Sequence, residues 1–318
     1  LAGIGVENTE ENRKAYRGML FTTEGLGKYI SGAILFEETL FQNHQDGESM
    51  VQKLNKLGII PGIKVDKGLN PLPGGGDVET FCSGLDGLVE RAAKYYEQGA
   101  RFAKWRAVLQ ITEDGCPSKL SIQENAWGLA RYARSVQESG LVPIIEPEIL
   151  MDGDHTIEKT AEVQEEVIKQ VYIACQANGV FLEGTLLKPS MTVNGAECQT
   201  KADPMKVAEM TIRTMERCVP ASVPGIVFLS GGLSEEAASM YLNNMNTIYR
   251  KALWNVSFSY GRALQHSCLK AWKGSETDAG QKALIARAQA NSKASKGSYV
   301  AGSQPSSDEQ LFVAGYTY

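Results

Sequence analysis

Histidine is scarce in this sequence. The 318 residues include only His44, His155 and His266, and each lies in a different part of the chain. A zinc site built from two or three imidazoles would have to gather nearly all of them. We therefore expect chemistry that depends on no metal. We expect no other cofactor either.

Basic charge and long apolar runs are lacking as well. The net charge is -5 and the pI is near 5.5, so the chain has no overall positive field that would attract nucleic acid. No apolar run approaches the roughly 20 residues of a membrane-spanning helix. The six cysteines form no CxxC pair, which is typical of free thiols in a reducing compartment. We expect neither a nucleic acid nor a membrane as a partner.

What the sequence does contain is a regular alternation of short apolar runs with longer helical segments. The predicted strands are residues 32–36, 59–66, 102–108, 141–148, 180–188, 224–231 and 254–261. The intervening segments carry helix-start signals, such as Ser121 and Glu124 in capping-box spacing, and Asp203 followed by Pro204. This alternation is the signature of βαβ units on a parallel sheet.

Two architectures fit such a sheet, an open doubly wound fold and a closed barrel. The open fold usually has GxGxxG after its first strand, whereas the glycine triplet 74–76 lacks that spacing. We therefore predict an α/β protein with a (β/α)8 TIM barrel. Because seven strands are visible and residues 8–20 look helical, we expect the first barrel strand to precede Leu1. We predict a catalytic domain over 1–291 and a mobile Ser/Gly-rich tail over 292–318.

Charged and polar residues recur at the carboxyl ends of the predicted strands. They are Lys64 with Asp66, Lys104 with Arg106, Glu146 with Glu148, Lys188, Ser230 and Arg262. In a barrel these ends converge on one mouth, where active sites are assembled. The alternative is a polar layer that merely seals the barrel.

The mixture of charges favours carbonyl chemistry. Lys104 and Lys188 would lower one another's pKa and free an amine to attack a carbonyl. Glu146 and Glu148 could transfer protons, one of them with a pKa raised by its neighbour. The glycine-containing turns after the last two strands, with Arg262, suit a phosphate.

Eight motifs, in order along the chain, resemble those of class I fructose-1,6-bisphosphate aldolases. They are ENTEENR, GIKVDKG, GLDGL, ARFAKWR, VPIIEPEIL, LEGTLLKPSM, FLSGG and FSYGRALQ. The resemblance covers essentially the whole chain. It implies a metal-independent lyase of glycolysis and gluconeogenesis that reversibly cleaves fructose 1,6-bisphosphate to dihydroxyacetone phosphate and glyceraldehyde 3-phosphate. It also implies a homotetramer.

The resemblance further implies roles for individual catalytic residues. Lys188 matches the lysine that forms a Schiff base with the ketose. Glu146 matches an acid/base carboxylate, and Glu148 matches a neighbour that orients the lysine. Lys104 matches one of a positive pair near the substrate, and Tyr318 matches a terminal tyrosine that folds over the mouth.

The remaining matched positions concern substrate binding. Arg106 completes the positive pair near the substrate hydroxyls and phosphate, and Lys64 matches a lysine near the far phosphate. The other phosphate pocket is matched by Ser230, Gly231, Gly261 and Arg262. One departure is that the family's first strand, with its catalytic aspartate, is absent; Asp66 matches a different family position.

Two other functions remain open. A transaldolase-like enzyme would share the chemistry of Lys188 but not the paired phosphate features. A scaffold or cytoskeletal-binding protein could use the same fold without catalysis, or as a second role. The family resemblance fits a cytoplasmic location, with the plastid stroma as the alternative.

Overall fold

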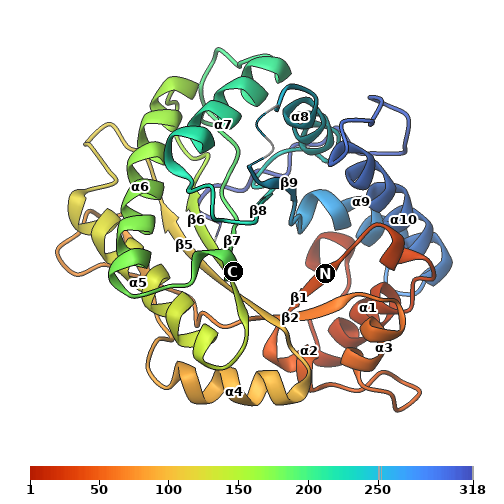
Figure 1. Ribbon diagram of the computed structural model, residues 1–318. Helices are drawn as coiled ribbons and strands as arrows, with labels where there is room; N and C mark the ends of the chain where they lie inside the picture. Colours follow the sequence, from red (N-terminus) through yellow and green to blue (C-terminus); the bar gives the residue numbers. More distant parts are fainter. Residues whose placement is uncertain (250, 252, 317–318) are drawn as a thin grey trace.

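The computed structural model describes residues 1–249, 251 and 253–316, and its centre is a parallel sheet. The seven strands are β1 (Gly32–Leu35), β2 (Ile60–Lys64), β5 (Phe102–Leu109), β6 (Val142–Ile149), β7 (Leu186–Leu187), β8 (Gly225–Phe228) and β9 (Asn255–Phe258). All neighbours pair in parallel, and their order in the sheet is their order in the chain. Figure 1 shows the strands inside a ring of helices. The predicted α/β barrel architecture is confirmed, with β1 and β9 as the terminal strands of the sheet.

The first helix of the ring precedes β1, and the others follow strands, with two after β1 and two after β9. They are α1 (Glu10–Phe21), α2 (Glu37–Phe41), α3 (Met50–Lys56), α4 (Leu88–Gln98), α5 (Lys119–Glu138), α6 (Ile157–Ala177), α7 (Pro204–Cys218), α8 (Glu235–Ile248), α9 (Arg262–Trp272) and α10 (Thr277–Ala294). A short antiparallel hairpin of β3 (Leu69–Pro71) and β4 (Thr80–Cys82) follows β2 and was not predicted. Within the described part of the chain, no helix is both long and apolar enough to cross a membrane.

Helix starts follow the capping chemistry of the sequence, with one correction. Asp203 caps α7, and Pro204 is its first residue, as predicted. Helix α5 begins earlier than expected, because the Ser118 hydroxyl, not that of Ser121, accepts the capping hydrogen bond. The predicted capping box at Ser121 is therefore wrong, and Ser121 lies buried inside the helix.

The predicted strand 180–188 is also shorter than expected. Its first part forms a 3₁₀ turn (Leu182–Gly184), and only β7 joins the sheet. The Thr185 hydroxyl donates to the Leu182 carbonyl at 2.7 Å, and the Gln137 amide donates to the carbonyls of Phe181 and Gly184. Because these side chains satisfy carbonyls that a longer strand would use, the chain turns before it reaches the sheet.

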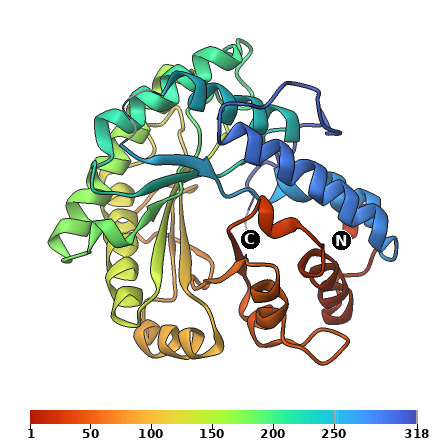
Figure 2. The ribbon, with the colours of Figure 1, turned by 45° about the vertical axis from the view of Figure 1, so that its right-hand side comes forward.

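Helix α1, near the start of the chain, lies beside α9 and α10 on one side of the barrel (Figure 2). Tyr16 of α1 packs against Trp272 of α9, with ring centroids 5.1 Å apart. Gln281 of α10 donates to the Met19 carbonyl of α1 at 3.0 Å. These contacts hold the first helix against the last two.

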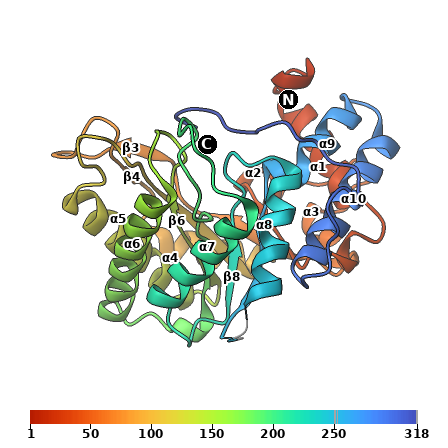
Figure 3. The ribbon, with the colours of Figure 1, turned by 90° about the horizontal axis from the view of Figure 1, so that it is seen from above.

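The segment after α10 crosses the barrel on the side of the β3–β4 hairpin, as Figure 3 shows. Helix α10 extends to Ala294, so the tail begins slightly later than the predicted boundary at residue 291. Within the tail, Leu311 is buried and its backbone N–H donates to the Gly232 carbonyl at 3.0 Å. The tail therefore packs on the loop that follows β8.

Candidate active site

The strand register places the predicted charged residues opposite one another on neighbouring strands. Lys64 of β2 lies opposite Lys104 of β5, and Arg106 lies opposite Glu146 of β6. Side chains two residues apart on a strand share a face, so Lys104 and Arg106 point to the same side of the sheet. The alternation predicted from the sequence thus places these charges together.

The centre of the site is Glu146, which lies between two ammonium groups. Its Oε1 is 3.2 Å from Lys188 Nζ, and its Oε2 is 3.1 Å from Lys104 Nζ. All three residues are at most 6% exposed. The backbone N–H of Lys188 donates to the Ile145 carbonyl at 2.8 Å, which fixes the lysine beside β6. Burial of three charges is tolerable here because each carboxylate oxygen faces a cation.

This arrangement changes the ionisation of the lysine in the direction that was predicted. Burial lowers the pKa of Lys188, and the neighbouring charge of Lys104 lowers it further, against the opposing effect of Glu146. The amine of Lys188 is therefore easier to deprotonate than an ordinary lysine.

The ionisation of Glu146 differs from the prediction. Burial alone would raise the pKa of Glu146, but the charges of Lys104, Lys188 and Arg106 outweigh burial and hold it below its usual value. The prediction was that one of Glu146 and Glu148 has its pKa raised by the other, and for Glu146 the direction is the opposite. In the structure, cations rather than Glu148 surround Glu146.

Glu148 pairs with Arg106 instead. Arg106 Nε donates to Glu148 Oε2 at 2.6 Å, and both residues are buried. The fixed guanidinium geometry makes this pair rigid. This hydrogen bond to Glu148 thus orients Arg106, whereas the carboxylate in contact with Lys188 is Glu146.

Asp66 is part of this cluster, although the sequence analysis assigned it no role. Its Oδ1 lies 2.6 Å from Lys64 Nζ, and its Oδ2 lies 3.8 Å from Lys104 Nζ and accepts from the Arg106 backbone N–H at 3.3 Å. Its spacing of two residues from Lys64 was the sequence pattern that could have indicated this role. Asp66 holds the cations of β2 and β5 at the same level.

The predicted phosphate loops follow β8 and β9, but both strands end earlier than expected. Ser230 and Gly231 lie just beyond β8, and Ser230 is buried. Gly231 has φ 54°, a conformation that favours glycine. Gly261 and Arg262 begin α9, so Arg262 stands at a helix N-terminus rather than at a strand end. A helix N-terminus with exposed N–H groups is suited to an anion.

The tail touches the same arginine. The Leu311 carbonyl accepts from Arg262 at 2.6 Å, and the Arg262 guanidinium lies 4.2 Å from the ring centroid of Tyr316. The Tyr316 carbonyl accepts a long hydrogen bond of 3.5 Å from Arg106. The predicted catalytic residue Tyr318 lies outside the described residues.

Asp152 forms another contact with the tail that the sequence did not indicate. Its Oδ1 accepts from the Gly315 backbone N–H at 2.7 Å, and Asp152 is buried. Such a bond joins residues far apart in the chain and leaves no pattern in the sequence. It brings the end of the tail to the loop after β6.

The described residues bring together no cluster of three or more His, Cys, Asp or Glu side chains that could hold a metal ion. What they do bring together are alternating cations and carboxylates from β2, β5, β6 and the segment after β7. Fold and site together define a barrel protein with a buried lysine–carboxylate centre at the carboxyl ends of its strands.

The comparisons with known proteins agree with this class. The family model for class-I fructose-bisphosphate aldolase matches residues 1–318. Fructose-bisphosphate aldolase 3, chloroplastic, from Arabidopsis thaliana is 55% identical over 322 residues, covering 100% of this chain and 81% of the relative. Fructose-bisphosphate aldolase 4, cytosolic, from the same plant is 54% identical over 319 residues, covering 99% of this chain and 81% of the relative. The chain belongs to the class I fructose-bisphosphate aldolase family and is a lyase.

A solved structure gives the same result for the fold. It is a fructose-bisphosphate aldolase from Plasmodium falciparum in complex with TRAP and a small-molecule inhibitor. It matches with a TM-score of 0.93 and 53% sequence identity, over 95% of this chain and 87% of that chain. The metal-independent chemistry expected from the scarcity of histidine fits this class of aldolase.

Proposed function

We propose that this aldolase cleaves fructose 1,6-bisphosphate reversibly to dihydroxyacetone phosphate and glyceraldehyde 3-phosphate through an imine on Lys188. The observation that carries the proposal is the contact of buried Glu146 with both Lys188 and Lys104. This contact places a buried amine, whose pKa is lowered by burial, next to a carboxylate that can move protons.

The chemistry passes through an imine and then an enamine. The Lys188 amine adds to the C2 ketone, and the carbinolamine loses water to give a protonated imine. Breaking the C3–C4 bond sends its electron pair into the imine and leaves an enamine, while a base takes the C4 hydroxyl proton. Glyceraldehyde 3-phosphate then departs. Protonation of the enamine carbon and hydrolysis of the imine release dihydroxyacetone phosphate and restore the amine.

The charged residues around Lys188 have different roles in these steps. Glu146 gives and takes the protons of carbinolamine formation and dehydration, because it is the carboxylate in contact with the amine. Lys104 keeps the pKa of Lys188 low and faces the substrate hydroxyls together with Arg106. Glu148 holds Arg106 in place.

The two phosphates bind on opposite sides of this centre. Lys64 contributes on the side of β2, where Asp66 holds it. On the other side, the pocket is formed by Ser230, Gly231, Gly261 and Arg262. The barrel of residues 1–291 thus carries the chemistry, and the tail of residues 292–318 brings Tyr318 over the mouth for the proton transfer to the enamine.

A cleavage assay with fructose 1,6-bisphosphate tests the reaction. Rapid formation of both triose phosphates, unaffected by EDTA, is the expected result. A transaldolase-like enzyme would act instead on ketoses without two phosphates, so a substrate panel separates the two functions. Absence of cleavage by a correctly folded protein would favour a scaffold, and metal-restored activity would contradict the proposed mechanism.

The proposal also covers the oligomeric state and the cellular compartment. We further propose a homotetramer, which sedimentation can measure, and cytoskeletal binding as a second role. The named relatives include a chloroplastic and a cytosolic aldolase. A cytoplasmic location, with the plastid stroma as the alternative, is tested by fractionation of the source cells.

A further inference from the structure

The segment that carries Lys188 is held by few strand contacts. Strand β7 consists of only Leu186 and Leu187, and it ends just before the lysine. The backbone N–H of Lys188 donates to β6, but residues 189–192 form no helix or strand although they are buried. Other groups must therefore satisfy the backbone of this buried segment and fix it in place.

Gln164 of α6 supplies such groups. Its side chain is buried, with the residue only 1% exposed. Its Nε2 donates to the Ser190 carbonyl at 2.9 Å and to the Ser190 hydroxyl at 3.1 Å. Its Oε1 accepts from the Thr192 hydroxyl at 2.6 Å. One buried amide thus fastens two positions of the segment that follows Lys188.

The same segment is also joined to β6 and to α7. The Ser190 hydroxyl accepts from the backbone N–H of Ile149, the last residue of β6, at 3.3 Å. The Thr192 backbone N–H donates to the hydroxyl of Thr211 in α7 at 3.0 Å. Gln164 therefore holds a segment that is linked directly to the strand that carries Glu146.

We infer that Gln164 is a positioning residue, which keeps the amine of Lys188 at its distance of 3.2 Å from Glu146. Only Pro189 separates Lys188 from Ser190, and its ring fixes the φ angle between them. A shift of Ser190 is therefore passed on to Lys188. The inference rests on the proposed function, in which Lys188 forms the imine and Glu146 moves its protons.

The experiment separates chemistry at Lys188 from binding of the phosphates. Gln164→Met keeps the length of the side chain but removes its donor and its acceptor. Single-turnover trapping with dihydroxyacetone phosphate and borohydride measures imine formation. Binding of hexitol 1,6-bisphosphate, which has two phosphates but no ketone, measures the phosphate pockets. We expect imine formation to slow roughly 10- to 100-fold, because small displacements from the reactive geometry have effects of this size, while binding stays unchanged.

Gln281→Met is the matched control. The side-chain amide of Gln281 in α10 also donates to a backbone carbonyl and a hydroxyl, those of Met19 and Thr22. These groups lie in the contact between α10 and α1 and not beside Lys188. Gln281→Met should lower the melting temperature but leave imine formation unchanged. If Gln164 served stability alone, Gln164→Met would give the same result.

Ser190→Ala tests the contact from the other side. It removes the hydroxyl that contacts Gln164 and Ile149 but keeps the Ser190 carbonyl, so imine formation should slow less than in Gln164→Met. Because the two variants disrupt the same contact, their combined effect should be smaller than the product of the separate effects. If Gln164→Met does not fold, Ser190→Ala decides, and a normal rate of imine formation in it would overturn the inference.

The position of the borohydride adduct distinguishes the inference from the proposed function. An adduct on another lysine would overturn both. An adduct that forms on Lys188 at the normal rate in Gln164→Met would overturn the positioning role alone, and the proposed function would stand. Equal losses of imine formation and of hexitol bisphosphate binding would also contradict the inference, because the whole site rather than the amine would then be displaced.

Discussion

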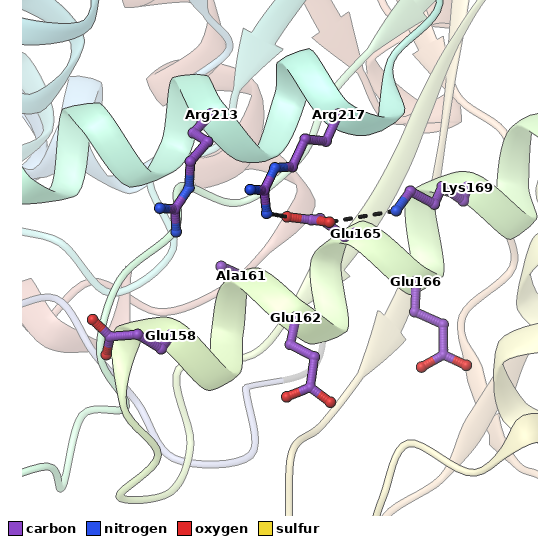
Figure 4. A pocket seen from close by; sticks show the side chains of 8 residues that line it. All are labelled: Glu158, Ala161, Glu162, Glu165, Glu166, Lys169, Arg213 and Arg217. Carbon is purple, nitrogen blue, oxygen red and sulfur yellow. Dashed lines mark hydrogen bonds and ion pairs between the residues drawn. The ribbon is translucent and has the colours of Figure 1, made fainter.

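Mixed charges at the mouth of this barrel can be compared with those in a groove on its outer surface. The groove lies between α6 and α7 and is a hollow of about 480 Å³ (Figure 4). In it, Glu165 lies 2.9 Å from Arg217 and 3.4 Å from Lys169. At the mouth, Glu146 lies at similar distances from Lys104 and Lys188. Each region therefore has one carboxylate between two cations.

The difference between the regions is the exposure of the cations. The side chains of Arg217 and Lys169 are 55% and 50% exposed, whereas that of Lys188 is 8% exposed. Water stabilises exposed charges, so such an ion pair contributes little to stability. Burial removes that water and lowers the pKa of Lys188. The arrangement of charges is thus shared, and burial of the amine distinguishes the mouth.

The largest effect is expected at the buried amine itself. Lys188→Ala removes the nucleophile, so cleavage of fructose 1,6-bisphosphate should fall by roughly ten-thousandfold or more. Steady-state assays measure the loss, and thermal melting confirms the fold. The matched control is Lys169→Ala in the groove, which should leave cleavage unchanged. Similar cleavage rates in both variants would contradict the proposed difference between the two regions.

A smaller effect is expected at the buried carboxylate. Glu146→Gln keeps the shape of the side chain but removes its proton-transfer function, so cleavage should fall by roughly 10²- to 10⁴-fold. The control is Glu165→Gln, the corresponding change in the groove. Rapid-quench measurement of imine formation should show the loss at that step; a normal rate of imine formation would contradict the role given to Glu146.

The neighbouring cation should change the pH dependence of the amine. Lys104→Met removes a positive charge that lowers the pKa of Lys188, so that pKa should rise and modification of Lys188 should require higher pH. Glu146→Gln removes an opposing negative charge and should shift the pKa downward. The rate of reaction with a small acylating reagent, followed by mass spectrometry across pH, measures both shifts. Shifts in the same direction would contradict this electrostatic account.

The smallest effect is expected in the groove. Arg217→Ala removes an exposed ion pair, so the free energy of unfolding should change by no more than about 1 kcal/mol and cleavage should be unaffected. Urea denaturation provides the measurement. A loss of several kcal/mol, or of activity, would show that the exposed pair is more important than its solvent contact implies.

Much of the barrel and of the site could be predicted from the sequence, because strand alternation and side-chain spacing are local patterns. They indicated the parallel sheet and the charged strand ends around Lys188. They failed where distant groups intervene: cations from other strands lower the pKa of Glu146, and a turn shortens β7. The tail contacts of Asp152 and Glu236 join carboxylates to backbone N–H groups far along the chain, which no local pattern reports.

The most direct test of this account is the identity of the lysine that forms the imine. The protein is incubated with dihydroxyacetone phosphate, reduced with borohydride, digested and mapped by mass spectrometry. If burial and the neighbouring charges select the reactive amine, the substrate adduct will be found on Lys188 and absent from Lys104 and Lys169. An adduct on another lysine, or adducts spread over exposed lysines, would contradict the central claim.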